Sequence, residues 1–226
     1  MNDTDTPSTT QFTPQTLTEL HLVGSSLIVA ISYQHTVLEK TGTDALLTKL
    51  PIIKGLTPFK SKTYAMDIDL SCVVLDQAAQ VLDVIWYGNL RNDNQSIRHS
   101  GDALCGADNF EQSLVNQEEI HIRLAQLDER AHHLLFFINS HHQDALCQAQ
   151  KAISKFSDNE EHVAHKVSFC ELGENTSAVL AWHVQRQRDD FLLSAPFCAV
   201  SIQQTNPDNF PQILSQLAQQ YVSPAE

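Results

Sequence analysis

Acidic side chains that could bind a cation gather in one segment of the chain, between residues 67 and 119. Asp67 and Asp69 alternate with apolar neighbours, so in a strand both carboxylates point to the same face. Two carboxylates held this way repel each other by about 1 kcal/mol at surface dielectric, and a bound cation removes the repulsion. The pattern therefore indicates a cation site, and it equally fits two solvated charges that protect an edge strand from aggregation.

Further oxygen donors follow this pair along the same segment. Calcium takes carboxylate, amide and backbone carbonyl oxygens on flexible loops. A long segment with little regular pattern, residues 100–116, contains Gly101 and Gly106, which allow the tight turns that wrapping a cation demands. The residues that offer suitable oxygens are Asp67, Asp69, Asn89, Asp102, Asp108, Glu118 and Glu119.

Short runs of β-branched and aromatic residues, separated by turn residues, must position these donors. Strands do not alternate with helices, which disfavours a doubly wound α/β fold and favours a β-sandwich of two sheets with one or two flanking helices. The predicted strands are residues 17–23, 27–33, 65–75, 81–87, 119–124, 134–139, 167–172, 178–184 and 191–202. The predicted helices are residues 42–54, 143–156 and a final amphipathic stretch that begins at Pro207.

Length and composition predict one main domain. The chain has 226 residues, of which 42% are hydrophobic, enough for one substantial core. Residues 1–16 are poor in apolar side chains and predict a disordered leader before a single domain over residues 17–226. Lys and Arg total 14 against 27 Asp and Glu, a net charge of −13 that disfavours nucleic acid as a partner.

The cellular compartment follows from features that the sequence lacks. The N-terminal residues have neither the basic start nor the apolar run of a signal peptide. No stretch approaches the roughly 20 apolar residues of a transmembrane helix. The five cysteines are scattered without a paired motif, as in a chain with reduced thiols. We therefore expect a cytoplasmic protein without a transmembrane segment.

Three motifs together resemble those of a known family. Residues 67–71 read D-x-D-x-S and continue into an apolar strand that ends in Asp76. Residues 86–90 read W-Y-G-N-L, and residues 99–102 read H-S-G-D. In order and spacing, these motifs are similar to those of the TerD family of tellurium-resistance and stress-response proteins. The resemblance covers about residues 27–200.

The resemblance implies a β-sandwich whose acidic loops bind calcium, with the donors named above as ligands. It also implies a non-enzymatic stress-response role beside other tellurium-resistance proteins at the cytoplasmic side of membranes. Residues 103–117 are longer and poorer in carboxylates than the family pattern, so one calcium ion is expected. Asp67 and Asp69 are the firmest ligands.

Other functions remain open on the sequence alone. A diverged scaffold without calcium could act through protein contacts, with residues 210–221 either docking a partner or packing on the domain itself. Histidine pairs such as His132 and His133, or His141 and His142, fit a transition-metal site and also fit scattered surface residues. A metal-dependent hydrolase is less favoured, since the sequence has no GxSxG, P-loop, dinucleotide or HExxH motif.

Overall fold

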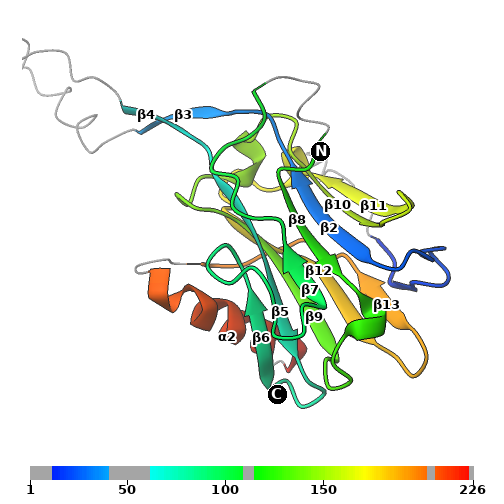
Figure 1. Ribbon diagram of the computed structural model, residues 1–226. Helices are drawn as coiled ribbons and strands as arrows, with labels where there is room; N and C mark the ends of the chain where they lie inside the picture. Colours follow the sequence, from blue (N-terminus) through cyan, green and yellow to red (C-terminus); the bar gives the residue numbers. More distant parts are fainter. Residues whose placement is uncertain (1–11, 41–61, 109–114, 203–206, 224–226) are drawn as a thin grey trace, which may run out of the picture.

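Two antiparallel sheets pack face to face in the computed structural model, which describes residues 12–40, 62–108, 115–202 and 207–223 (Figure 1). The larger sheet has the order β1 (Gln15–Thr16), β13 (Phe191–Ser194), β12 (Ala178–Arg186), β9 (His133–Ser140), β5 (Ile68–Leu75) and β6 (Val81–Ile85), and β14 (Cys198–Ala199) also pairs with β12. The smaller sheet has the order β11 (Val163–Ser168), β10 (Ile153–Asp158), β2 (Leu27–Ser32), β8 (Glu118–Ile122) and β7 (Ile97–His99). The predicted β-sandwich is confirmed.

A two-stranded ribbon and a few helical turns complete the described chain. The ribbon, β3 (Val37–Lys40) with β4 (Lys62–Ala65), extends from one end of the sandwich in Figure 1. The single-turn 3-10 helices are η2 (Leu124–Gln126), η3 (Leu146–Gln148), η4 (Phe169–Glu171) and η5 (Pro207–Asn209). The last element described is the helix α2 (Phe210–Val222).

Alternation along the strands builds the core between the two sheets. On β5, Ile68, Leu70 and Cys72 point inward and are fully buried, while Ile120 and Ile122 do the same from β8. Each such side chain removed from water contributes roughly 1.5–3 kcal/mol, less the entropy of ordering it. The intervening residues of β5 therefore face the outer side of the larger sheet, and Asp69 is one of them.

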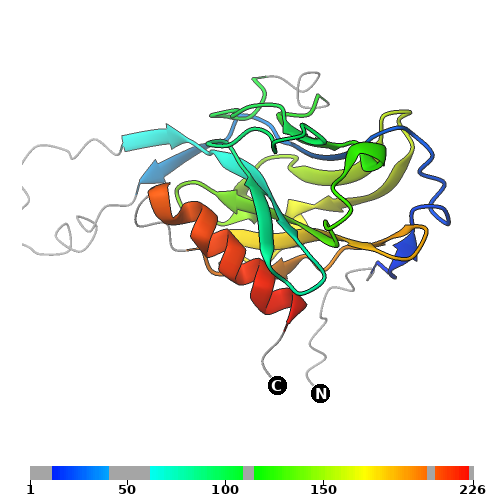
Figure 2. The same cartoon turned by 60° about the horizontal axis from the view of Figure 1, so that its bottom comes forward.

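A second apolar cluster covers that outer side. Val73 and Leu75 of β5 contact Phe210, Leu214 and Ala218, which are fully buried on one face of α2. Figure 2 shows α2 lying across the larger sheet near β5 and β6. The spacing of four residues along the helix gives one apolar stripe. The amphipathic face of the predicted C-terminal helix thus packs on its own sheet.

One edge of β5 is paired with a neighbouring strand along only half of its length. Its partner β6 pairs only with the second half, from Cys72 to Leu75. The first half, Ile68 to Ser71, still pairs with β9 on the other side but has no strand on this edge. The backbone groups of this open edge need other partners, and they find them in the acidic segment.

Three predicted elements are wrong. Residues 17–23 form turns, and residues 169–171 form the turn η4 after β11. Residues 143–156, predicted helical from their Ala and Leu spacing, form η3 and then enter β10. Lys151, with φ of 51°, ends the helical path there, and pairing with β2 and β11 on both sides then outweighs helix propensity. The predicted helix at residues 42–54 lies outside the described residues.

Three other predictions concern the N-terminal residues, the cysteines and transmembrane helices. Of the predicted leader, residues 1–11 lie outside the described residues. The last two residues of that predicted leader form β1, which pairs with β13. All five cysteines are free thiols. None of the helices in the described ranges is both long and apolar enough to cross a membrane.

Candidate metal centre

Five titratable side chains converge at the open edge of β5. Ligand atoms of Asp67, Asp69 and His141 lie within 4.8 Å of one another, and so do those of Asp69, Asp102 and Glu118. Asp69 belongs to both groups. The chain reaches this place from the start of β5, the turn after β7, the start of β8 and the end of β9. We call these residues the acidic cluster.

Acceptor atoms in the cluster outnumber the donors that face them. Asp67 is only 8% exposed, and its Oδ1 has no hydrogen-bond partner. Asn139 donates from Nδ2 to Oδ2 of Asp69 at 3.0 Å. The side-chain oxygen of Asn139, Oδ1, is buried and has no hydrogen-bond partner. Across the described ranges, no Lys or Arg forms an ion pair with a cluster carboxylate. Unpaired buried oxygens of this kind are the donor set of a hard cation.

The pKa values report the same shortage of positive charge. Burial, and then the neighbouring Asp69, raise the pKa of Asp67 to about 7. Burial and Asp69 also raise the pKa of Asp102. The hydrogen bond to Asp69 raises the pKa of His141. A divalent cation would reverse these shifts, because it favours the charged carboxylates.

Glu118 closes the open edge of β5. Its Oε2 accepts a hydrogen bond from the backbone nitrogen of Leu70 at 2.8 Å, and its Oε1 accepts one from the backbone nitrogen of Ala103 at 3.1 Å. The next free amide of this edge, that of Ile68, donates to the hydroxyl of Tyr33 at 3.3 Å. Glu118 thus joins β5 to the loop after β7 and belongs to the fold as well as to the cluster.

The His-Ser-Gly-Asp turn aims Asp102 at the cluster. Nε2 of His99 donates to the carbonyl of Leu70 at 2.9 Å, and Nδ1 accepts from the backbone nitrogen of Gly101 at 3.0 Å. These two bonds define a neutral ring with the proton on Nε2. Gly101 has a φ of +117°, a backbone conformation that is nearly exclusive to glycine. The turn can therefore reverse sharply and place Asp102 beside Asp69.

Three of the predicted ligands lie apart from this group. Glu119 follows Glu118 in β8 and so points to the opposite face, where its Oε2 lies 2.5 Å from Nε2 of His121. The amide nitrogen of Asn89 donates to the carbonyl of Val84 at 2.8 Å in the turn after β6. Asp108 is exposed and belongs to neither group of ligand atoms.

His141 joins the acidic cluster, whereas sequence reasoning placed it only in a histidine pair with His142. Its Nδ1 lies 3.5 Å from Oδ2 of Asp69, and its backbone nitrogen donates to the carbonyl of Asp67 at 3.0 Å. The signal is the pairing of β9 with β5, which sets Asn139 opposite Asp69 and brings His141, in the turn directly after β9, to the aspartates. Only the register of that pairing was missing.

The fold and the cluster define a class of protein, a two-sheet β-sandwich with an acidic site at the open edge of one strand. The family model described as the TerD domain matches residues 34–196, more than half of the chain. The chain belongs to the TerD family, and the resemblance read from its motifs is confirmed.

One relative and two solved structures extend the comparison. The Tellurium resistance protein TerZ of Serratia marcescens is 24% identical over 117 residues, which are 52% of this chain and 58% of that protein. The aligned part therefore spans less than two thirds of this relative.

Both solved structures share the fold at low sequence identity. The crystal structure of protein SAV2460, described as of unknown function, has a TM-score of 0.60 and 11% identity, covering 85% of this chain and 97% of that one. SCO6318 of Streptomyces coelicolor A3(2), described as a homologue of telluride resistance protein (TerD), has a TM-score of 0.59 and 10% identity, covering 89% and 99%.

Proposed function

We propose that the acidic cluster binds one calcium ion and that the protein acts without catalysis in the stress response of the tellurium-resistance type. The observation that carries the proposal is the unpartnered Oδ1 of buried Asp67 beside Asp69 and Asp102. Calcium is favoured over softer metals because the cluster offers four carboxylates and one imidazole. Asp67, Asp69 and Asp102 would hold the ion, with Glu118 completing the site.

In this proposal, calcium binding controls a surface of the protein by ordering one loop. The loop from His99 to Asp108 carries Asp102 and is tied to the sandwich by Glu118 through Ala103. Neutralising the clustered carboxylates would order this loop, and an ordered loop would present one surface to partner proteins. By analogy with the family, those partners are other stress-response or tellurium-resistance proteins at the cytoplasmic side of membranes.

Calorimetric titration tests the proposal. Calcium added to the metal-free protein should release heat at a single site and raise the thermal midpoint. Asp67→Asn and Asp69→Asn should each weaken binding at least tenfold, because each removes a charged ligand. Asp108→Asn is the matched control, since it removes the same charge from the same region outside the cluster. Absence of both heat and stabilisation at millimolar calcium rejects calcium binding.

A scaffold without calcium is the second candidate, and two contacts favour it. Both oxygens of Glu118 already accept backbone hydrogen bonds, and His141 offers Asp69 a partial counter-charge. In that case the protein would act only through protein contacts, and metal-free and calcium-loaded protein would show the same thermal midpoint. Metal-dependent hydrolysis ranks third and is tested with generic phosphate and ester substrates in the presence of divalent metals.

A further inference from the structure

A basic group of side chains lies on the outer face of the smaller sheet, on the other side of β8 from the acidic cluster. Arg98 of β7 stands directly opposite His121 of β8, and Arg123 follows directly after the end of β8, two residues beyond His121. Because strand side chains alternate, all three point to the same face. Cross-strand neighbours in such positions are about 4.5–8 Å apart at Cβ.

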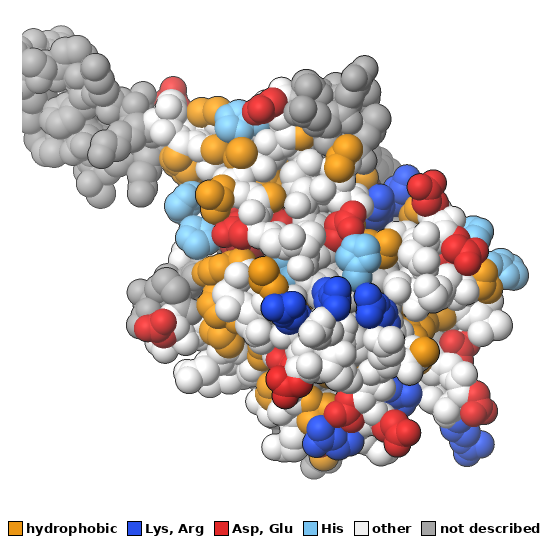
Figure 3. Space-filling model, in the orientation of Figure 1, with side chains coloured by type: hydrophobic (Ala, Val, Ile, Leu, Met, Phe, Trp, Pro, Cys, Tyr) orange, Lys and Arg blue, Asp and Glu red, His pale blue; other side chains and the backbone are white. Residues whose placement is uncertain are grey.

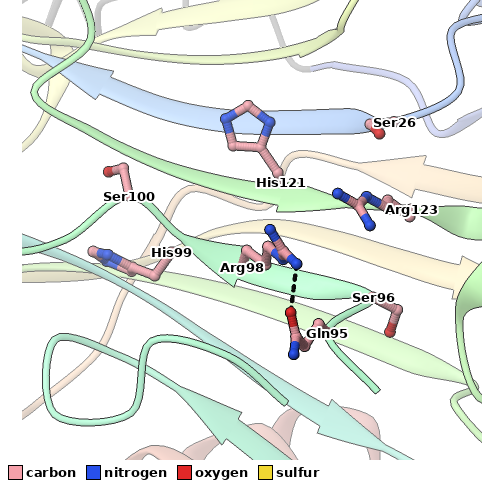
Figure 4. Close-up of a pocket in the computed structure, with 8 residues that line it drawn as sticks. All are labelled: Ser26, Gln95, Ser96, Arg98, His99, Ser100, His121 and Arg123. Atoms are coloured by element: carbon pink, nitrogen blue, oxygen red, sulfur yellow. Dashed lines mark hydrogen bonds between the residues drawn. The ribbon is translucent and has the colours of Figure 1, made fainter. Parts of the chain in front are cut away.

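The group surrounds a hollow of about 310 Å³ whose rim carries hydroxyl groups from Ser26 and Ser100. Figure 4 shows the guanidinium groups of Arg98 and Arg123 extending toward one another between β7 and β8, with His121 beside them. Figure 3 shows Lys or Arg side chains gathered beside a histidine over the middle of the face that it presents. The hollow is large enough for a small organic anion.

The two arginines lack carboxylate partners. Among the residues described, neither Arg98 nor Arg123 forms an ion pair; Arg98 donates to Gln95, and Arg123 donates to Oε1 of Gln126 at 3.4 Å. The carboxylate of Glu119, which lies on the same face of β8, is paired with His121. Both arginines line the same hollow, so an anion bound there would supply the counter-charge that they lack.

We propose that this hollow is a binding site for a phosphomonoester group. A guanidinium donates in a planar fork that matches phosphate oxygens, and two forks suit the double negative charge of a monoester better than a singly charged carboxylate or diester. The hydroxyls of Ser26 and Ser100 can donate to the remaining oxygens. The ligand would also relieve the repulsion between the two arginines.

The proposed site is separate from the acidic cluster. Glu118 points inward from β8 to the cluster, whereas His121 and Arg123 point outward. Removing calcium therefore leaves both arginines in place, because Arg98 in β7 and Arg123 after β8 lie outside the loop from His99 to Asp108 that the ion would order. The site can be tested on metal-free protein, and its failure would leave the calcium proposal untouched.

The test is calorimetric titration of the full chain with phenyl phosphate after calcium has been removed on a chelating resin. We expect binding that weakens at least tenfold in Arg98→Gln and in Arg123→Gln, because each loses charged hydrogen bonds. Arg130→Gln is the matched control: it removes one positive charge from an exposed arginine paired with Asp128, away from the hollow. Circular dichroism confirms that the variants remain folded.

Two further arms identify the source of the phosphate group. Dimethyl phosphate, a diester, should bind at least tenfold more weakly than phenyl phosphate. Vesicles containing phosphatidic acid, compared with phosphatidylcholine alone, show whether a lipid headgroup also enters the hollow. Binding of phenyl phosphate with or without vesicle binding supports the site. The proposal is overturned if Arg130→Gln loses as much affinity for phenyl phosphate as the other two variants, or if dimethyl phosphate binds equally well. It is also overturned if neither phenyl phosphate nor the vesicles bind.

Discussion

Nδ1 of His141 lies 3.5 Å from Oδ2 of Asp69, and this imidazole shares a group of possible ligand atoms with Asp67 and Asp69. The ring is partly exposed, and the hydrogen bond to Asp69 raises its pKa, so a proton on His141 supplies the counter-charge that a cation would otherwise supply. Proton and cation therefore compete for the same carboxylate.

Replacing His141 should change the affinity for zinc and the affinity for calcium by different amounts. In His141→Gln, zinc affinity should fall at least tenfold, because imidazole is a preferred zinc ligand. Calcium affinity should stay within about threefold, since calcium is held by oxygens. Calorimetric titration of each metal measures both, with His142→Gln as the control because that neighbouring ring is exposed and belongs to neither ligand group. A larger loss for calcium than for zinc would contradict the assignment of an oxygen site.

Replacing Glu118 should weaken the fold even in the absence of metal. An amide has one acceptor oxygen, so Glu118→Gln leaves the backbone nitrogen of Leu70 or of Ala103 without an acceptor. A buried donor left unpaired costs about 1–3 kcal/mol of unfolding free energy, which urea denaturation of the metal-free protein measures. Glu119→Gln, on the exposed side of β8, should change stability by less than about 1 kcal/mol. Equal effects of the two variants would contradict the edge-capping role.

Adding a methyl group at Gly101 should disturb the site through the backbone. No atom lies within 4 Å of a Cβ built there, so the expected loss of about 1–3 kcal/mol comes from its φ of +117°. Relief of that strain would move Asp102 away from Asp69, so calcium affinity should fall with stability. Gly173→Ala, at an exposed glycine without a positive φ, is the control. Unchanged stability and affinity in Gly101→Ala would show that the turn tolerates an L side chain.

Sequence reasoning found the aspartates because their spacing is local. Asp67 and Asp69 share a face by strand alternation alone, and the His-Ser-Gly-Asp motif located Asp102. His141 and Asn139 escaped because they reach the cluster only through the register of β9 on β5, a pairing across about seventy residues. Local patterns carry no information about such a register until the partner strand is known.

Glu118 and Glu119 show a second limit. The family resemblance implies both as ligands, although neighbours in a strand point to opposite faces, and only the fold decides which one faces the cluster. The helix predicted at residues 143–156 failed for a related reason. Its apolar spacing fits a helix, but residues 153–156 pair with β2 on one side and β11 on the other as part of β10.

The docking of α2 can be tested by truncating its anchor. Phe210 is fully buried and its ring lies 5.5 Å from that of Trp86 and 6.0 Å from that of Tyr87. Phe210→Ala should lower the free energy of unfolding by about 3–5 kcal/mol in urea denaturation. Gln216→Ala, on the exposed side of the same helix, should change it by less than about 0.5 kcal/mol. A helix that detaches to bind a partner would instead give a small loss at Phe210.

A row of three imidazoles on the outer face of the larger sheet should make stability depend on pH. Nδ1 of His133 lies 2.9 Å from Nε2 of His183, and Nε2 of His133 lies 3.2 Å from Nδ1 of His132. Burial, and then the neighbouring rings, lower the pKa of both His133 and His183 to about 4. The native state therefore holds these rings neutral, whereas the unfolded chain protonates them near 6.5.

Folding lowers the pKa of such a base, so its full contribution to native stability is present at pH values above the unfolded pKa. That contribution is lost as the pH falls toward the folded pKa. Between pH 7 and pH 5 we expect each such imidazole to lower the unfolding free energy by about 2 kcal/mol. Asp67 acts in the opposite direction over this range, because its raised pKa of about 7 means that protonation of the carboxyl stabilises the native state. His183→Gln should flatten this dependence in urea denaturation at a series of pH values. His142→Gln, at an exposed ring, should leave it intact. An equally steep fall in His183→Gln would show that the buried imidazoles are not its source.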